Sequence, residues 1–293
     1  MSKKAAAKSP KAESKTESKT VGPIKTPAHL LKDALALLPA NSPEGLRQLL
    51  EVLFHDIDAD DLGFFEPQIL AEMAESHWAM ARERKPGQTK IKVYCPEVPG
   101  LEHRRTVVDI VCDDLAFLVD STAAEINRYD YLINILIHPS AVPVFDEKKG
   151  FTGIKEGGKK GEGRQSHVHV QINKVLSKAE SKALEQGLHK VLIDITAANK
   201  QWLSMLQKMK ETSTELSVST TPHSASEIQK CCAFLDYLAD NNFTFLGYRE
   251  YLFVDGKDGV KSKTVKGSSL GLLHDDVEPA YISESDEGLP RNL

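Results

Sequence analysis

Hydrophobic residues recur every three or four positions through the first part of the chain, which is typical of helices with one buried face. Three helices are predicted in this helical region, residues 26–86: at about 28–38, from Pro43 onward, and at about 67–84. Lys85-Pro86-Gly87 then forms a strong stop signal. We expect the three helices to make one small helical unit.

From Lys90 the hydrophobic pattern alternates, which predicts strands near residues 90–94, 105–112, 131–138 and 166–172. The run at 105–112 is almost continuously apolar, as in a strand covered on both faces. Asp113 and Asp114 follow it as candidate N-caps of a helix. The order strand, helix, strand predicts a split βαβ unit. The stretch 150–165, rich in glycine and lysine, is predicted to be a long hairpin loop between two strands.

A long helix is predicted at about 179–209, because apolar residues there alternate between steps of four and three. We expect its far half to reach a neighbouring domain or a second subunit. The residues of this heptad seam are Leu184, Leu188, Val191, Ile195, Ala198, Trp202, Met205 and Met209.

The remaining chain is predicted to hold a linker at 213–224 and a partial second domain at 225–293. A helix at about 225–239 leads into an aromatic strand, FTFLGYREY (residues 243–251), and a turn near 255–259 precedes a return strand. We expect the aromatic strand to be buried and to open a domain that the chain leaves unfinished. The prediction for the whole is an α+β fold, with a ferredoxin-like domain at 88–212.

Charge separates the front of the chain from the rest. Residues 1–25 contain seven lysines and two glutamates, whereas the whole chain carries a formal net charge of −5. A nucleic-acid arm and a targeting peptide are alternatives for this segment, but it contains few large apolar residues and no apolar face, which favours a disordered, solvated tail. No apolar run approaches the length of a membrane span, so we expect a cytoplasmic protein with neither a membrane nor a nucleic-acid partner.

Several motifs approach known binding sites without completing them. Gly153 and Gly158-Lys159 have the spacing of a phosphate-binding loop, but Lys160 occupies the Ser/Thr position, and no GxGxxG follows a strand. The acidic run with Asp56, Asp58, Asp60 and Asp61 lacks the glycine and glutamate of a calcium loop. The four cysteines have no metal-binding or disulfide spacing, so reduced and mostly buried thiols are expected. We therefore expect no catalytic and no cofactor-binding residue in this chain.

His167 and His169 are predicted to project from the same face of one strand, which suits a metal ion. Spacing nominates no third ligand, and Gln171 shares that face. Polar residues without a metal are therefore the favoured interpretation of this strand.

The turn after strand 105–112 is the remaining candidate site. Free backbone N–H groups at a helix start bind carboxylates, so Asp113, Asp114, Phe117 and Ser121 are proposed as a possible ligand-binding set. Two aspartates at one place oppose a further negative charge, and ordinary helix capping is the alternative.

Five segments, in order, resemble the N-terminal part of the large bacterial NAD-specific glutamate dehydrogenases. They are SHWAMARERKPGQTKIKVYCP (76–96), VCDDLAFLVDS (111–121), IHPSAVPVFDEKKG (137–150), SHVHVQI (166–172) and FTFLGYREY (243–251), and LGLLHDD (270–276) adds to the last of them. The resemblance covers most of residues 60–275. The lysine-rich tail and the loop GIKEGGKKGEG are not family features.

The resemblance implies tandem ACT-type βαββαβ domains, which are associated with regulation by amino acids, and a separate later region that deaminates glutamate with NAD. It implies NAD as the cofactor of the full-length family but none in this chain. We therefore expect a catalytically inactive regulatory or assembly segment that forms a homo-oligomer or contacts a catalytic region. A stand-alone amino-acid-sensing module and a structural oligomerisation segment are the alternatives.

Overall fold

The computed structural model describes residues 27–54, 57, 65–97, 105–155, 157, 163–256 and 259–274. The predicted disordered tail and the acidic run from Asp56 to Asp61 lie outside these described residues, apart from Ile57, so their predictions are untested.

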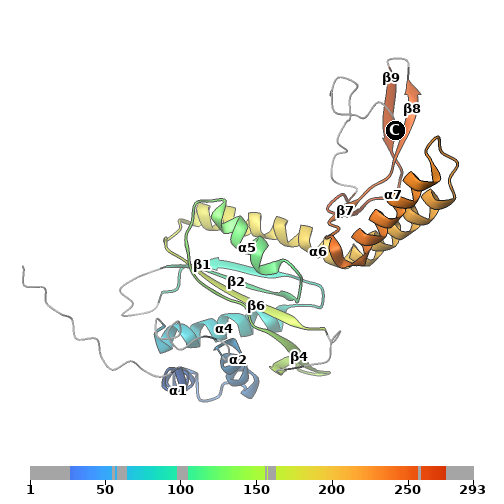
Figure 1. Cartoon of the computed structure of the whole chain (residues 1–293). Helices are drawn as coiled ribbons and strands as arrows, with labels where there is room; N and C mark the ends of the chain where they lie inside the picture. The colour runs from blue at the N-terminus through green and yellow to red at the C-terminus, as the bar shows by residue number, and fades with distance from the viewer. Residues whose placement is uncertain are drawn as a thin grey trace, which may run out of the picture.

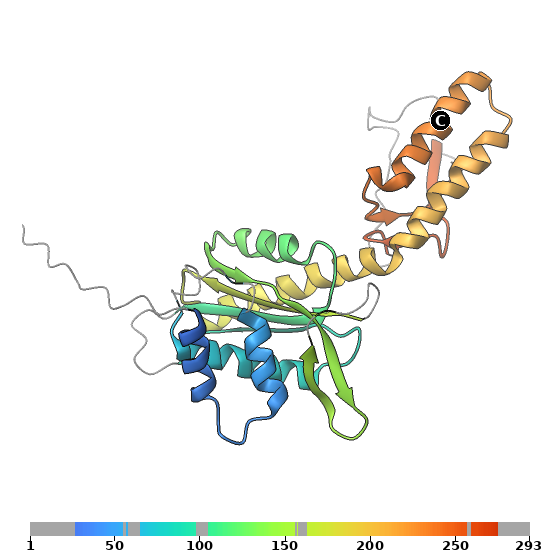
Figure 2. The ribbon, with the colours of Figure 1, turned by 60° about the horizontal axis from the view of Figure 1, so that its bottom comes forward.

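The helical region is confirmed. Its helices are α1 (Pro27–Leu37), α2 (Glu44–Phe54) and α4 (Pro67–Glu83). Leucines at the predicted spacing are buried between them, including Leu46, Leu49 and Leu53 of α2. Pro67 begins α4, where its missing N–H removes no helical hydrogen bond. These helices cover one face of the sheet and share its core (Figure 2).

The helical region, the sheet and the helices packed on it form the first lobe of the chain. Its centre is a six-stranded antiparallel sheet in the order β1-β2-β6-β4-β5, with β3 also paired to β6. Because β6 lies between β2 and β3 and is antiparallel to both, the segment β2-α5-β3 is a split βαβ unit, as predicted. The elements are β1 (Lys90–Tyr94), β2 (Thr106–Asp113), α5 (Leu118–Asn127), β3 (Ile133–Ile137), β4 (Ser140–Asp146), β5 (Gly150–Lys155) and β6 (Gln165–Ile172).

Both faces of this sheet are covered by helices. Helices α5 and α6 (Lys178–Val218) lie on one face, and α1, α2 and α4 lie on the other (Figure 1). Strand β6 is buried along its whole length, and β2 is buried except at Asp113. The α+β prediction is confirmed, as is the expectation that the strand at 105–112 is covered on both sides.

The glycine- and lysine-rich stretch differs from its prediction. Its first residues are not loop but β5, which pairs with β4 in an antiparallel hairpin. Glycine and lysine in this stretch indicated a loop, but Ile154 pairs with Pro143 of β4. A proline is tolerated there because the hairpin lies at the edge of the sheet. Residues 156 and 158–162 lie outside the described residues.

The contact between α2 and this hairpin depends on Gly45. A Cβ atom at this position would overlap the backbone oxygen of Thr152 and would also crowd Gly153. Gly45→Ala is therefore expected to lower the free energy of unfolding by at least about 1 kcal/mol, because backbone on β5 must move. Gly163→Ala is the matched control, since a Cβ there meets nothing within 4 Å. Urea unfolding of both variants tests this, and equal stability of the two would contradict it.

Helix α6 is longer than predicted and joins two parts of the chain. It begins at a capping box of Ser177 and Glu180 and continues to Val218, so the first residues of the predicted linker are helical. Its first half covers the sheet with Leu184, Leu188 and Ile195 of the predicted seam. The seam is wrong at Val191, since Leu192 is the residue buried there. Its far half contacts α7 (Ala225–Tyr237) and β10 (Leu270–Gly271).

The aromatic segment 243–251 is not the continuous buried strand that was predicted. Only β7 (Gly247–Tyr248) forms a short pair, with β10, before the hairpin of β8 (Tyr251–Gly256) and β9 (Gly259–Thr264) begins. Phe243 is 58% and Leu246 is 44% exposed. The chain packs closely at Gly247, because a Cβ there would lie 2.9 Å from Leu273 Cγ. A kinked turn, η1 (Leu238–Asn242), with Asn241 in a left-handed conformation, precedes this segment.

In the described part of the chain, no helix combines the length and the apolar character needed to cross a membrane. All four cysteines are free thiols, as expected, but only Cys112 is buried, whereas Cys231 is exposed. The expectation of mostly buried thiols is therefore wrong.

Burial raises the pKa of the Cys112 thiol to about 12, a shift that nearby Arg84 only partly opposes. Because the thiolate is the reactive form, we expect iodoacetamide at neutral pH to alkylate Cys231 in the folded protein and to leave Cys112 unmodified. Peptide mass spectrometry measures both sites, and unfolding in denaturant should make Cys112 react. Equal alkylation of the two thiols in the folded protein would contradict the burial of Cys112.

Candidate functional site

The predicted turn residues Asp113 and Asp114 do not cap α5. Asp113 still belongs to β2, and α5 begins only at Leu118, after Phe117 in a left-handed conformation with no side-chain cap. Asp113 forms an ion pair with Arg84, and Asp114 accepts a hydrogen bond of 2.8 Å from Ser166 Oγ. The prediction that these aspartates cap the helix is wrong, because β2 extends beyond its apolar run to Asp113 and α5 begins later than expected.

The four candidate residues have separate surroundings. Both aspartates already have partners, and the Ser121 N–H donates to the Phe117 carbonyl within the first turn of α5. Of the set, Phe117 alone lines a cavity described for this chain. Ligand binding by these residues stays a prediction.

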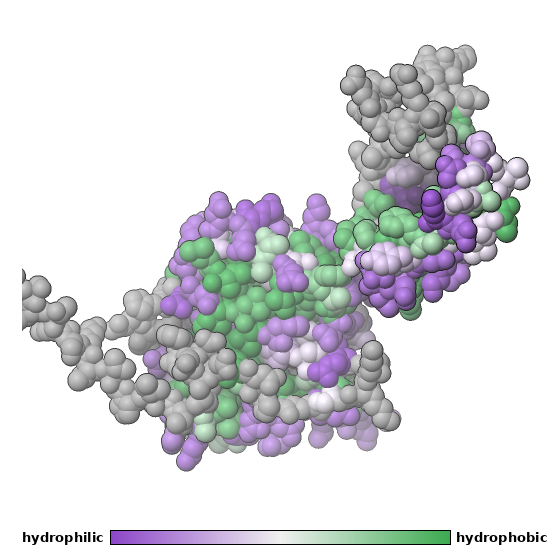
Figure 3. Space-filling view, in the orientation of Figure 1, coloured by the Kyte–Doolittle hydropathy of each residue, from purple (hydrophilic) through white to green (hydrophobic). Residues whose placement is uncertain are grey.

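The cavity at Phe117, here the junction cavity, has a volume of about 270 Å³ and lies where the first lobe meets the C-terminal elements. Hydrophobic side chains gather at this junction around α6 (Figure 3). The Asn199 side chain fixes the turn, because its Oδ1 accepts from the Ala116 N–H at 3.0 Å and its Nδ2 donates to the Ala116 carbonyl at 3.1 Å. The cavity lining is Ala116, Phe117, Ala198, Asn199, Trp202, Leu206, Ala239, Asn241, Phe243, Thr244, Phe245 and Leu246.

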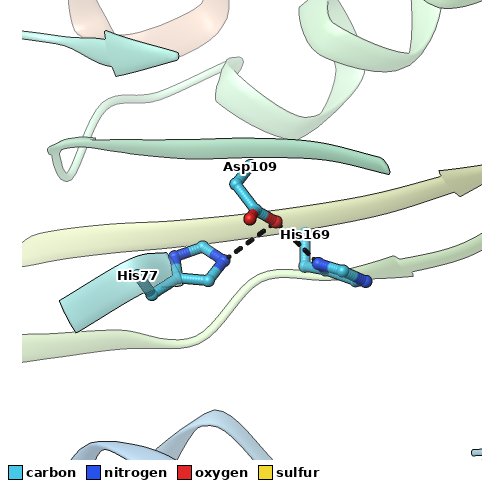
Figure 4. Close-up of side chains that lie close together, drawn as sticks. All are labelled: His77, Asp109 and His169. Atoms are coloured by element: carbon cyan, nitrogen blue, oxygen red, sulfur yellow. Dashed lines mark hydrogen bonds and ion pairs between the residues drawn. The ribbon is translucent and has the colours of Figure 1, made fainter. Parts of the chain in front are cut away.

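A second candidate site is a polar cluster buried between α4 and the sheet. His77 projects from α4, Asp109 from β2 and His169 from β6, and all three side chains are buried. Figure 4 shows both imidazoles turned toward the Asp109 carboxylate. The three ligand atoms, one from each residue, lie within 4.8 Å of one another. This arrangement is suited to a metal ion, although hydrogen bonds also account for most of its contacts.

Asp109 is the centre of this cluster. Its Oδ2 accepts hydrogen bonds from Ser76 Oγ at 2.6 Å and from Tyr94 Oη at 2.9 Å. Its Oδ1 lies 2.7 Å from His169 Nδ1 and 3.3 Å from His77 Nε2. A buried carboxylate is costly unless it is paired in this way.

The surroundings also set the protonation of the cluster. Burial alone would raise the pKa of Asp109, but His77 and the hydrogen-bonded His169 outweigh burial and hold that pKa well below its usual range. Burial and the Asp109 charge raise the pKa of Tyr94, so its hydroxyl stays protonated and donates. Asp109 is therefore an ionised acceptor inside the protein.

The prediction that His167 and His169 share a strand face is confirmed, since both rings approach His77. That face is not solvated, because α4 covers it. Sequence reasoning missed His77 and Asp109 as neighbours of His169. The single polar residue inside the apolar run TVVDIVC was the available signal, since a buried aspartate needs partners.

Comparison with known proteins finds a similar domain family and two similar proteins. Residues 49–188 match the family described as glutamate dehydrogenase, ACT1 domain. This part of the chain is therefore similar to the ACT1 domain of glutamate dehydrogenases. The matched ACT1 region begins within α2 and ends within α6, so it contains the sheet, α4 and the His77, Asp109 and His169 cluster.

Two relatives of this chain are proteins named NAD-specific glutamate dehydrogenase. The one from Pseudomonas aeruginosa is 30% identical over 227 residues, and the one from Halomonas elongata is 27% identical over 213 residues. These regions are 76% and 70% of this chain but only 14% and 13% of the relatives. The chain thus spans about one seventh of the length of these relatives.

Proposed function

We propose that this chain is the N-terminal regulatory segment of an NAD-dependent glutamate dehydrogenase, acting in the cytoplasm, and that the junction cavity receives an amino-acid effector. The family match and the two relatives support the enzyme class. In a full-length protein of this kind, another region would oxidise glutamate to 2-oxoglutarate with NAD. The ACT1 region would respond to the amino-acid supply.

The junction cavity is the observation that carries the effector proposal. It combines aromatic walls from Phe117, Trp202 and Phe243 with polar side chains from Asn199 and Thr244, the usual composition of a small-molecule site. Phe117 lies at the start of α5, where no side chain caps the helix. A helix start favours a carboxylate, and the aromatic walls favour an apolar side chain. An amino acid with an apolar side chain fits both features.

Isothermal titration calorimetry with a panel of amino acids tests this proposal. We expect measurable binding of one or more amino acids with apolar side chains and weaker or no binding of lysine and aspartate, because no charged side chain of the described residues lines the cavity. The absence of heat with every member of the panel would contradict the effector role. The buried cluster around Asp109 does not touch this cavity, so the two sites are tested separately.

The regulatory proposal also predicts an inactive polypeptide. We expect the purified 293-residue chain to form no NADH from glutamate and NAD, since its sequence contains no dinucleotide-binding GxGxxG after a strand. Absorbance of NADH measures this directly, with an active glutamate dehydrogenase in the same buffer as the positive control. Glutamate-dependent turnover by this chain would overturn the assignment of a purely regulatory role.

Assembly is a second candidate function, favoured by large hydrophobic side chains that stay exposed on the far half of α6 and on α7. We propose that they contact a second copy or a catalytic region. Sedimentation velocity tests the first possibility, and a strict monomer at all concentrations would rule out a role in self-association. The side chains are Trp202, Leu203, Val218, Phe234 and Tyr237.

A further inference from the structure

The buried cluster joins three elements that are distant in sequence. His77 lies on α4, and Asp109 and His169 lie opposite each other on the paired strands β2 and β6. All three side chains are buried, and both imidazoles are turned toward the Asp109 carboxylate, as Figure 4 shows. Few buried polar groups converge in this way without a reason, because each loses its hydration on folding.

We propose that His77 Nε2, Asp109 Oδ1 and His169 Nδ1 bind a divalent transition-metal ion of the zinc type. Two imidazoles and one carboxylate are a ligand set that zinc uses, whereas calcium and magnesium prefer oxygen ligands. Ligand atoms that share a tetrahedral zinc at about 2.0–2.1 Å are roughly 3.3 Å apart. Asp109 Oδ1 is 3.3 Å from His77 Nε2 and 2.7 Å from His169 Nδ1, and all three ligand atoms lie within 4.8 Å of one another. Metal binding therefore needs a small opening of the Asp109–His169 pair and an adjustment of the two imidazoles toward the ion.

The unsatisfied nitrogen of His77 supports a metal over hydrogen bonding alone. His77 Nε2 is buried and approaches Asp109 Oδ1 at 3.3 Å, but it does not reach the geometry of a hydrogen bond with any described residue. A metal at the centre of the cluster would give this nitrogen a partner. The two hydroxyl donors, Ser76 and Tyr94, both bind Asp109 Oδ2 and leave Oδ1 for the metal.

The outer nitrogens of both rings have the partners that metal-bound imidazoles require. His77 Nδ1 lies 3.3 Å from His167 Nδ1, and His169 Nε2 lies 3.2 Å from the Gln171 amide. When the metal occupies His77 Nε2 and His169 Nδ1, the ring protons lie on His77 Nδ1 and His169 Nε2. His77 then donates to His167, and His169 donates to the Gln171 amide oxygen once that amide is turned by half a rotation.

The metal would connect α4 to the two central strands of the sheet. It would therefore fix the helical layer on the ACT1 sheet, and a water molecule would complete the tetrahedron that the three protein ligands leave open. Because the ligands come together only in the folded protein, metal binding should stabilise the fold.

Cobalt and zinc titration of the untagged, chelator-treated chain tests the proposal. We expect Co²⁺ to produce the visible absorption of tetrahedral cobalt, to saturate at one equivalent, and to be displaced by Zn²⁺. We also expect one equivalent of Zn²⁺ to raise the unfolding midpoint. No cobalt spectrum and no zinc-dependent shift would overturn the proposal and leave the cluster as a hydrogen-bonded network.

Two variants locate the metal. His169→Gln should weaken Zn²⁺ binding at least roughly 100-fold, since ligand loss exceeds the 10- to 100-fold effect of outer partners. His189→Gln, at an exposed histidine of α6, should bind as the parent chain does. Undiminished zinc binding by His169→Gln would overturn the proposal.

X-ray absorption of the zinc-loaded parent chain gives an answer even if His169→Gln does not fold. Nitrogen and oxygen ligation with two imidazoles is expected. Sulfur ligation would assign the metal to the cysteines and overturn the site.

Discussion

Asp109→Ala is expected to destabilise the metal-free chain by about 3–5 kcal/mol, the range found when one partner of a buried ionic group is removed. The substitution leaves the hydroxyls of Ser76 and Tyr94 and the Nδ1 of His169 without their acceptor in the protein interior. Each unpaired buried donor costs free energy, because water cannot replace the lost partner. Urea unfolding at pH 7 in the presence of a chelator measures the effect.

Ser76→Ala is the matched control for this prediction. It removes one donor and keeps the Asp109 carboxylate and its other contacts, so a loss of about 1 kcal/mol is expected. If Asp109→Ala were no more damaging than Ser76→Ala, the carboxylate would not be the centre of a buried network.

Phe117→Ala is expected to weaken effector binding by about 2 kcal/mol, or roughly 30-fold in Kd, the size of effect seen for a central aromatic contact. The side chain lines the junction cavity at the start of α5, and its removal widens the cavity and exposes the ligand to water. Calorimetry with the amino acid that binds the parent chain most tightly measures this change.

Phe234→Ala controls for the loss of an aromatic side chain. Phe234 is exposed on α7 and does not line the junction cavity, so its substitution should leave the Kd unchanged. Equal losses in both variants would show that binding occurs elsewhere or depends on the general stability of the chain.

The elements with a strong hydrophobic period were predictable from the sequence. The run at 106–112 indicated a strand buried on both faces, and the heptad spacing indicated α6. Strand β5 was missed because glycine and lysine obscure an alternating pattern that the pairing with β4 stabilises. The aromatic segment 243–251 was misassigned, because aromatic residues favour strands but here two of them, Phe243 and Phe245, line the junction cavity.

The candidate sites show a similar limit. His167 and His169 were recognised together because residues two positions apart on a strand project from the same face. His77 and Asp109 were not connected to them, since tertiary packing of α4 on the sheet brings these residues together. Likewise, Phe117 could be placed on a turn, but its cavity depends on a helix and a segment far along the chain.

The indole N–H signals of the two tryptophans test the central claim most directly, because Trp202 lines the junction cavity and Trp78 is buried in the core beneath the other face of the sheet. In an NMR titration with an amino acid that has an apolar side chain, the account predicts that the Trp202 signal moves and saturates while the Trp78 signal stays in place. A Trp202 signal unchanged by every such amino acid would contradict an effector site at this junction.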